Sequence, residues 1–502
     1  MKRITGMLAK LGKRALVVLM LSATMAIGLG AQTFTTLFYF HGAEGSEPEA
    51  SLIQAADGNL YGTTVQGGTG AYFVYGTVFK VASNAPTTLY TFGEGPGGLG
   101  FLNGSEPFAG VVQGTDGNFY GTTYLGGTQC ATIGCGTVFK VAPSGSLTTL
   151  HSFDGTDGWQ PIGGVIEAAD GNFYGTTTKG GAYNGGTVFK ITPGGALTTL
   201  YNFCSQSNCA DGDAPQAALV QAANGDLYGT TTYGGTQDNC YMTIGEPSTC
   251  GTVFRLTLSG TLTTLHSFDH TDGYFPSSAL VQATNGYLYG TTSWGGPNCG
   301  TNGCGTVFQI TPRGTLTTLH SFDGSDGETP YAGLIQATDG NLYGTTLFGG
   351  DSLCPGGCGT VFKITLSGTL TTLHNFCFEG ECADGVMPYG GLVQATNGEF
   401  YGTTTQRSYE STGGTVFSLA VGLGPFVRMQ TAAGKVGASV SILGTDLTGA
   451  TRVSFHGAAA AFTVVSPSLI TTTVPAGATT GKVEVSTPGA TLLSNVPFRV
   501  TP

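Results

Sequence analysis

Charge is the scarcest property of this sequence. Asp, Glu, Lys and Arg together make up 10% of its 502 residues, and 30 acidic against 18 basic residues give a formal net charge of −12. Nucleic acid and anionic lipid surfaces both need a basic face, and few basic residues lie beyond residue 14. We therefore expect neither kind of partner. The low charge does not indicate disorder, because the mean hydropathy is +0.12 and aromatic residues reach 10%.

Motifs that mark common enzyme classes are also missing. The sequence has no nucleophile elbow of the Gly-x-Ser-x-Gly type, no zinc-binding His-Glu-x-x-His and no phosphate-binding loop. No helical periodicity is visible, which argues against repeat folds built from helices. The sequence therefore predicts no catalytic residue, and calcium is the only cofactor considered.

A long apolar run occurs only at the N-terminus. A basic segment precedes Ala15 to Leu29, which is short for a membrane span, and cleavage after Ala31 fits the pattern. Residues 1–31 are therefore interpreted as the signal peptide of an exported protein, located in the extracellular space, on the cell surface or in the periplasm. No membrane span is expected in the mature chain. No cysteine follows the leader before Cys130, so no lipid anchor is expected there.

The cysteines fall into local pairs with none left over. No Cys-x-x-Cys occurs, so metal binding is a weaker interpretation than disulfides, which are typical of exported chains with an even cysteine count. The predicted pairs are Cys130/Cys135, Cys204/Cys209, Cys240/Cys250, Cys299/Cys304, Cys354/Cys358 and Cys377/Cys382.

The tetrapeptide Tyr-Gly-Thr-Thr recurs at spacings of 54 to 61 residues. Each copy lies in a unit of four short β-type segments separated by glycine turns; in the middle unit these are 163–168, 173–178, 186–192 and 197–203. Such units are typical of β-propellers. We therefore expect an all-β, seven-bladed β-propeller with four strands per blade. The seven copies begin at Tyr61, Tyr120, Tyr174, Tyr228, Tyr289, Tyr343 and Tyr401.

The connection lengths predict the strand order. Segments one and two, and three and four, are joined by tight turns, whereas the other connections are long, so segment one should be innermost and segment four outermost. The last unit has no fourth segment, and 33–40 resembles one. We expect the N-terminal strand to close the ring and to remove an open sheet edge. The glycine of the tetrapeptide, such as Gly62, is expected to let a neighbouring backbone approach closely.

The unit written GNLYGTT…GG…GTVFK resembles the GloVer-type tandem repeat of exported bacterial proteins over about residues 33–420. The resemblance implies an exported repeat protein without an assigned activity, here a propeller over 32–422. The composition then shifts, and 440–457 and 470–489 resemble an IPT/TIG domain, a small immunoglobulin-like β-sandwich assigned to 425–502. Such modules act as spacers or binding modules.

The long loops between segments two and three should share one face with the crossovers between blades. We call this the loop face and the opposite side the turn face. All six cysteine pairs fall on the loop face, so their predicted disulfides would fix these loops; we call loops closed in this way stapled loops. Such loops on a rigid scaffold are where binding and catalytic residues are usually found. Aromatic rings on this face suit sugar binding, although packing between the blades under the loops explains the same residues and is the favoured interpretation of them. The candidate ligand-binding residues are Trp159, Tyr233, Tyr274, Trp294, Tyr331 and Phe348.

Three crossovers carry paired aspartates that suggest calcium. The pairs are Asp154 and Asp157, Asp269 and Asp272, and Asp323 and Asp326. Their spacing of three differs from the alternating ligands of an EF-hand loop, and Asx-turn capping explains the same residues. Four histidines at equivalent outer-strand positions, His151, His266, His320 and His374, are interpreted as structural.

Three functions are compatible with these patterns. The leading hypothesis is a non-catalytic exported propeller that binds polysaccharide or another surface polymer through the loop face. The second is a scaffold that binds a surface protein. The third is a carbohydrate-active lyase or hydrolase with carboxylates on the central rim, which the fold alone does not establish.

Overall fold

The structure is a computed structural model, and it describes residues 32–69, 74–82, 85–93, 101–130, 133–237, 240, 249–351, 353–378, 382–408 and 413–501. The proposed signal peptide, 1–31, therefore lies outside the described residues. In the described part, the only helical segment is the short η1 (Ser207–Cys209), and no helix is long and apolar enough to cross a membrane.

The described residues between 33 and 420 form four-stranded antiparallel sheets, each built from consecutive strands except the last. The first four sheets are β2 (Ile53–Gln54), β3 (Leu60–Thr64), β4 (Val74–Ala82), β5 (Ala85–Gly93); β6 (Val112–Gln113), β7 (Phe119–Thr123), β8 (Thr137–Val141), β9 (Leu147–Ser152); β10 (Ile166–Glu167), β11 (Phe173–Thr177), β12 (Thr187–Ile191), β13 (Leu197–Asn202); and β14 (Val220–Gln221), β15 (Leu227–Thr231), β16 (Thr252–Leu256), β17 (Leu262–Ser267). The others are β18 (Val281–Gln282), β19 (Leu288–Thr292), β20 (Thr306–Ile310), β21 (Leu316–Ser321); β22 (Ile335–Gln336), β23 (Leu342–Thr346), β24 (Thr360–Ile364), β25 (Leu370–Asn375); and β26 (Val393–Gln394), β27 (Phe400–Thr404), β28 (Thr415–Ala420) with β1 (Thr33–Tyr39).

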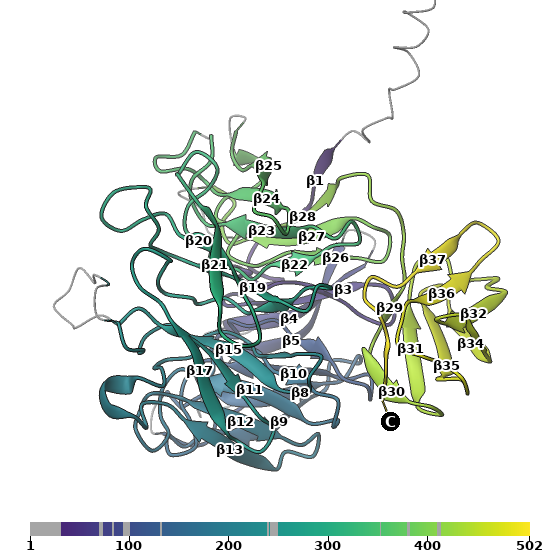
Figure 1. Ribbon diagram of the computed structural model, residues 1–502, viewed down its shortest axis with the longest axis horizontal. Coiled ribbons are helices and arrows are strands. Elements are labelled where there is room, and N and C mark those ends of the chain that lie inside the picture. Colours follow the sequence, from purple (N-terminus) through teal and green to yellow (C-terminus); the bar gives the residue numbers. More distant parts are fainter. Residues whose placement is uncertain are drawn as a thin grey trace, which may run out of the picture.

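The seventh sheet joins the two ends of this region. Its order is β26, β27, β28 and β1, and β1 pairs antiparallel with β28 from Thr33 opposite Ala420 to Tyr39 opposite Thr415. The N-terminal strand is thus the outermost strand of the last sheet, as expected. The all-β fold with repeated four-stranded sheets in a propeller-like arrangement is confirmed (Figure 1).

Hydrogen bonds from one side chain per sheet connect neighbouring sheets. The first threonine of each tetrapeptide donates to a backbone carbonyl at the start of the next sheet, and the last donor, Thr403, reaches Ala50 of the first sheet at 3.2 Å. These links therefore close a ring of seven sheets. The other six, at 2.9–3.1 Å, are Thr63 to Ala109, Thr122 to Gly163, Thr176 to Ala217, Thr230 to Ser278, Thr291 to Ala332 and Thr345 to Gly390.

A second ring of hydrogen bonds runs along the innermost strands. The side chain that ends each of these strands accepts from a backbone N–H in the turn of the preceding sheet; it is a glutamine in six sheets and Glu167 in one. The ring closes where Gln54 accepts from the backbone N–H of Thr396 at 2.9 Å. These contacts place the two-residue strands innermost.

The glycine of the tetrapeptide makes room for a side chain rather than for a backbone. A Cβ at Gly62 would lie 2.7 Å from the Phe79 ring and 2.7 Å from the Leu52 side chain, both within its own sheet. The expectation that a neighbouring backbone approaches here was wrong. The space is needed by the phenylalanine of the third strand, which is fully buried in each sheet.

The C-terminal region forms a β-sandwich. One sheet contains β29 (Arg428–Met429), β31 (Ser439–Leu443), β35 (Leu469–Thr473) and β34 (Phe462–Ser466); the other contains β33 (Ala458–Ala460), β32 (Arg452–Phe455), β36 (Val483–Ser486) and β37 (Thr491–Leu493). A short pair, β30 (Ala433–Lys435) and β38 (Arg499–Thr501), completes it. Its core includes Ile442, Val453, Ile470 and Val485.

The sandwich stands on the turn face of the ring (Figure 1). Arg428 donates to the carbonyl of Gln54 at 2.8 Å, Gln430 to that of Gly114 at 3.0 Å, and Ser468 to that of Ala56 at 2.9 Å. Thr445 bonds Thr396, and Arg499 contacts the carbonyl of Ala223. These partners belong to the inner turns of four sheets, so the sandwich spans the turn-face end of the ring.

The packing around the tetrapeptide glycine predicts a stability effect. Gly290→Ala would place a Cβ 2.6 Å from the Phe308 ring and 2.7 Å from the Leu280 side chain. Because overpacking of a core is destabilising, we expect a loss of about 1–3 kcal/mol in the free energy of unfolding. Gly194→Ala is the control, since its Cβ would meet only a hydroxyl at 3.8 Å. Equal denaturation midpoints for the two variants would contradict the packing role.

Candidate binding site on the ring axis

Each crossover turns sharply toward the ring axis at a residue that precedes a proline. This residue has a left-handed backbone in every sheet, although none is glycine and such a conformation is unfavourable for other residues. The seven residues, with φ between 54° and 58°, are Glu47, Glu106, Gln160, Ala214, Phe275, Thr329 and Met387.

A backbone hydrogen bond holds each left-handed residue in place. Its N–H donates to the carbonyl of the residue just before the Gly-Thr-Val-Phe stretch of the third strand, for example Gln160 to Cys135 at 3.0 Å and Thr329 to Cys304 at 2.9 Å. In four sheets this acceptor is a disulfide-bonded cysteine, the second of its loop. The stapled loops are therefore tied directly to the crossover.

All six predicted disulfides are present. They join Cys130 to Cys135, Cys204 to Cys209, Cys240 to Cys250, Cys299 to Cys304, Cys354 to Cys358 and Cys377 to Cys382. Six disulfides fit an oxidising, extracellular type of environment.

The residue after each crossover proline lies at the axis. Tyr331 of the sixth sheet donates to Gln216 of the fourth at 3.3 Å, and this contact passes over the fifth sheet. Its ring lies 4.3 Å from that of Tyr389 in the seventh sheet, tilted by 42°. Side chains from different sheets therefore meet here. The seven equivalent residues, called the axial set, are Glu49, Phe108, Ile162, Gln216, Ser277, Tyr331 and Tyr389.

Glu49 is the one ionisable acid in the axial set. Burial raises the pKa of its carboxyl to about 7, and the negative charge of Glu47 adds to the effect. The charge of Glu49 in turn helps burial to raise the pKa of Tyr331 and of Tyr389. The carboxyl of Glu49 therefore lies close enough to both phenol groups to act on them electrostatically.

A second layer of side chains surrounds the axial set. Phe108 contacts the ring of Tyr124 edge-on at 5.2 Å, and the hydroxyl of Ser277 bonds that of Ser293 at 2.9 Å. Burial raises the pKa of Tyr233, and Tyr331 contributes electrostatically, so Tyr233 lies close to the axis as well. The site is thus aromatic and polar on one side and apolar near Phe108 and Ile162.

Of the six predicted aromatic residues, only Tyr331 belongs to the axial set. The other five take part in isolated β-bridges between a crossover and the residue that follows a tetrapeptide strand. The bridged pairs are Trp159 with Lys179, Asp213 with Tyr233, Tyr274 with Trp294, and Glu328 with Phe348. Tyr274 is buried, and the other four are half-buried. Tyr274 and Trp294 share one sheet and Tyr233 lies close to Tyr331, whereas Trp159 and Phe348 lie in two sheets other than that of Tyr274 and Trp294. The contact of these residues with a ligand stays a prediction.

The axial residues Glu49, Gln216, Ser277 and Tyr389 were missed by the sequence interpretation. No motif contains them, because the residue type changes from unit to unit. The available signal was positional, since each directly follows the proline of a crossover. The crossover proline recurs in all seven units, and its successor differs.

The paired aspartates of the crossovers cap their own loop. One oxygen of Asp154 accepts from the N–H of Thr156 at 2.8 Å and from its hydroxyl at 2.7 Å, while Asp157 accepts from the N–H of Asp154 at 3.0 Å and bonds His151 at 2.6 Å. The pairs at Asp269 and Asp272 and at Asp323 and Asp326 repeat this pattern. The geometry fits the Asx-turn alternative, and calcium binding stays a prediction.

The outer-strand histidines have partners that the sequence interpretation did not name. His151, His266 and His320 each bond the second aspartate of the following crossover, and His374 bonds Asp384 at 2.8 Å. Each also packs edge-on against a phenylalanine two residues later. These contacts agree with the structural role predicted for the four histidines.

Two groups of side chains have the proximity needed for a metal ion. The sulfur atoms of Cys354, Cys358, Cys377 and Cys382 lie within 4.8 Å of one another, and Cys204, Cys209 and Asp213 form the other group. All these cysteines are in disulfides, and a metal is bound by thiolate rather than by disulfide sulfur. The oxidised chain therefore offers no thiolate at either place.

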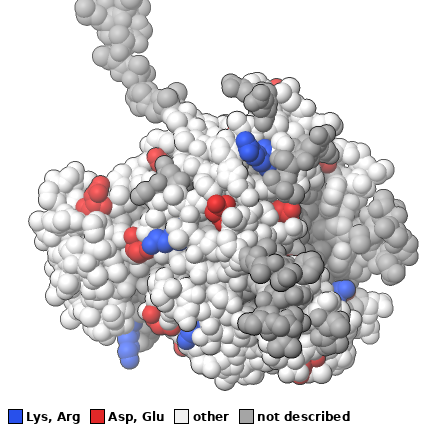
Figure 2. Space-filling model, turned by 180° about the vertical axis from the view of Figure 1, so that it is seen from behind, with Lys and Arg blue, Asp and Glu red and all other residues white. Residues whose placement is uncertain are grey.

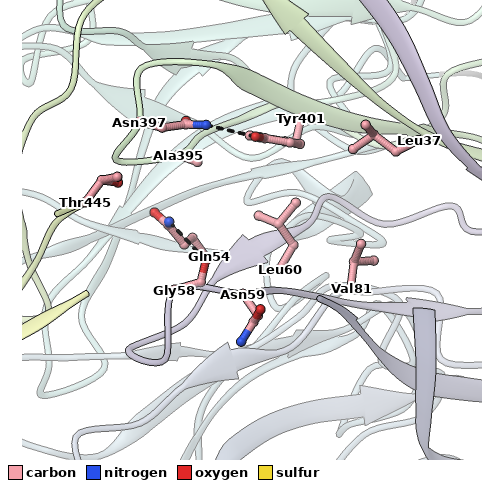
Figure 3. A pocket seen from close by; sticks show the side chains of 10 residues that line it. All are labelled: Leu37, Gln54, Gly58, Asn59, Leu60, Val81, Ala395, Asn397, Tyr401 and Thr445. Atoms are coloured by element: carbon pink, nitrogen blue, oxygen red, sulfur yellow. Dashed lines mark hydrogen bonds between the residues drawn. The ribbon is translucent and has the colours of Figure 1, made fainter. Parts of the chain in front are cut away.

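A cleft of about 240 Å³ lies away from the axis, at the seam between the seventh and first sheets. Leu37, Leu60 and Val81 line its apolar side, and Asn397, Tyr401 and Thr445 its polar side (Figure 3). Tyr401 is the only half-buried tyrosine of the seven tetrapeptides. The Tyr401 side chain is therefore less covered than its six equivalents.

Charged side chains are sparse on the molecular surface. Figure 2 shows isolated acidic and basic side chains on one face, without a continuous patch of either sign.

Comparison with known proteins identifies the repeat. The profile described as the Gloeobacter/Verrucomicrobia repeat matches residues 98–299 and 239–453, which together cover more than half of the chain. The chain belongs to this repeat family. An IPT/TIG domain matches residues 425–500. Both predicted resemblances are confirmed. No curated protein matches the chain.

Three solved structures illustrate what the chain is similar to at low sequence identity. A copper-containing fungal alcohol oxidase is 13% identical, with 95% of this chain and 100% of that chain covered and a TM-score of 0.48. A putative glucose dehydrogenase from Thermus thermophilus is 13% identical, with 78% and 100% covered and a TM-score of 0.37. Hydrazine synthase of Kuenenia stuttgartiensis is 14% identical, with 72% and 93% covered and a TM-score of 0.42. None of these supports an argument about chemistry.

The aspartate geometry predicts the response to calcium. Since the carboxylate oxygens already accept hydrogen bonds from their own loops, calcium should leave the melting temperature unchanged relative to a chelator, as measured by differential scanning fluorimetry. A bound ion would stabilise the folded state by mass action, so a calcium-dependent rise would show that the crossovers do bind it.

The disulfide pattern predicts the thiol count. The chain unfolded without reductant should expose no reactive thiol, and the reduced chain should expose all twelve. A thiol reagent applied to both samples measures this directly. Free thiols in the unreduced sample, at a level above trace, would be incompatible with six closed pairs.

Proposed function

We propose that this protein is an exported, non-catalytic binding protein that recognises a polysaccharide or another surface polymer on the loop face, at the axial set. The observation that carries the proposal is the meeting of Tyr331, Tyr389 and Gln216 from three different sheets. Aromatic rings beside amide, hydroxyl and carboxyl groups suit a ligand that has both apolar faces and hydroxyl groups.

The rigidity of the site supports this function. Every crossover is fixed by a backbone hydrogen bond to the start of a third strand, and in four sheets, including those of Tyr331 and Tyr389, the acceptor is a disulfide-bonded cysteine. The axial side chains are therefore held before a ligand arrives. Preorganisation reduces the entropy that binding must overcome. The sandwich spans the opposite end of the ring, so a ligand is expected to enter from the loop face.

The enzymatic alternative has less support. Glycoside hydrolysis usually needs two carboxyl groups flanking the scissile bond, and the axial set has only Glu49. A tyrosine base would have to ionise, but burial raises the pKa of both Tyr331 and Tyr389. A protein scaffold is the remaining alternative, and it differs from the proposal in its ligand class.

A glycan array with the mature chain, residues 32–502, tests the proposal. We expect a selective hit whose affinity falls about tenfold or more in Tyr331→Ala and Tyr389→Ala, because each variant removes a ring from the axis. Tyr183→Ala is the matched control: this tyrosine is 57% exposed and lies in a loop-face segment away from the axis. A blank array, or equal losses in all three variants, would overturn the proposal.

A further inference from the structure

The carboxyl of Glu49 has no partner of opposite charge within the described part of the chain. It makes no hydrogen bond or ion pair there, whereas every outer-strand histidine and most other acidic side chains near the crossovers are paired. Glu47 acts on this carboxyl electrostatically, and the carboxyl in turn acts on Tyr331 and Tyr389; none of these three groups supplies positive charge. The negative charge of an ionised Glu49 is therefore not compensated by a positive group in the described part of the chain.

The two tyrosines beside Glu49 add a second feature. Their rings are inclined by 42° with centroids 4.3 Å apart, and both side chains are half-buried. Ring faces attract cations, and pairs or cages of such rings are a common way to bind alkylammonium groups. A carboxylate next to inclined rings offers an ammonium group both charge and a polarisable surface.

Electrostatics supports the same interpretation. The raised pKa of Glu49 is the result of burial and of the like charge of Glu47, so the ionised form is disfavoured in the empty site. A positive group at the axis would reverse this effect. No lysine, arginine or histidine among the described residues forms an ion pair with Glu49, so that group would have to come from a ligand.

We propose that the axial set binds an alkylammonium group, carried by an amino-sugar residue of the polymer, between Glu49 and the ring pair of Tyr331 and Tyr389. The proposal rests on the proposed function and specifies its ligand class. Gln216 and Ser277 remain available at the same site for hydroxyl groups of the sugar.

Two matched oligomers test the ligand class. At pH 7, isothermal titration should detect binding of a glucosamine hexamer and at least about tenfold weaker binding of the N-acetylglucosamine hexamer, which lacks the charge. Glu49→Gln should remove this preference. Glu328→Gln is the control, since it makes the same change at a half-buried loop-face carboxyl that lies outside the axial set. Melting curves establish that both variants fold.

With a permanently charged probe, any pH dependence of binding comes from groups of the protein and not from the ligand. Tetramethylammonium does not titrate, so its affinity should rise as the pH increases from 6 to 8, because Glu49, with a pKa of about 7, loses its proton over this range. Glu49→Gln should make the affinity independent of pH. Competition between tetramethylammonium and the glucosamine hexamer places both at one site.

The outcomes distinguish the two proposals. If both hexamers bind equally and Glu49→Gln changes nothing, the ammonium site is wrong while polymer binding stands. If neither hexamer binds but tetramethylammonium does, with the expected pH dependence, the cation site stands and its source is a methylated amine rather than an amino sugar. If no probe binds, the inference is overturned, and the array result decides the proposed function separately.

Discussion

Closure of the ring is the constraint on which the rest of this structure depends. A four-stranded sheet of this size has two apolar faces, and each is buried only against a neighbouring sheet. The links from the tetrapeptide threonines and from the innermost side chains run through all seven sheets and return from Thr403 to Ala50 and from Thr396 to Gln54. The residues that make the last link lie more than 340 positions apart in the chain. The first strand, β1, then supplies the last sheet with its outer edge.

The same constraint positions the candidate site. Because the ring is closed, seven crossovers enter it at one level, and each is bent by a left-handed residue whose N–H is bound by the third strand. Such a backbone is costly, and its repetition in every sheet marks it as part of the architecture rather than of one site. The residue after the crossover proline, two positions beyond the left-handed residue, then lies at the axis. Its side chain has no part in closing the ring, so its type is free to differ between units, and it does.

The contrast between repeated scaffold residues and the variable residue at the axis explains what could be predicted from the sequence. The tetrapeptide and the Gly-Thr-Val-Phe stretch repeat because every sheet makes the same contacts, and repetition is visible in one sequence. Strand number, strand order and the role of the N-terminal strand follow from it. The role of Gly62 did not, because a glycine pattern shows that space is needed without showing whether Phe79 or a backbone fills it. The disulfides were predictable because each closes a short local loop.

The axial set could not be recognised in the same way. Glu49 and Tyr389 come together only after the ring has closed, and neither lies in a repeated motif. Aromatic content led instead to Trp159, Tyr274 and Trp294, which are tied into bridges between the crossovers and the tetrapeptide strands. In a repeat protein, positions that are alike in every unit serve the scaffold. The position after the fixed crossover proline varies in residue type and lies at the axis, so it is where one unit can differ from another in chemistry.

The sandwich domain limits how a polymer could use this axis. Its contacts with the turns of four sheets, including those of Gln54, Gly114 and Ala223, hold it across the turn-face end. If the proposed ligand enters from the loop face alone, the axial set can receive the terminus of a chain or a side branch. Holding the middle of a chain would require a groove across the loop face, and the variable, stapled loops would have to form its walls. Closure of the ring and docking of the sandwich together therefore favour recognition of polymer ends over recognition along a strand.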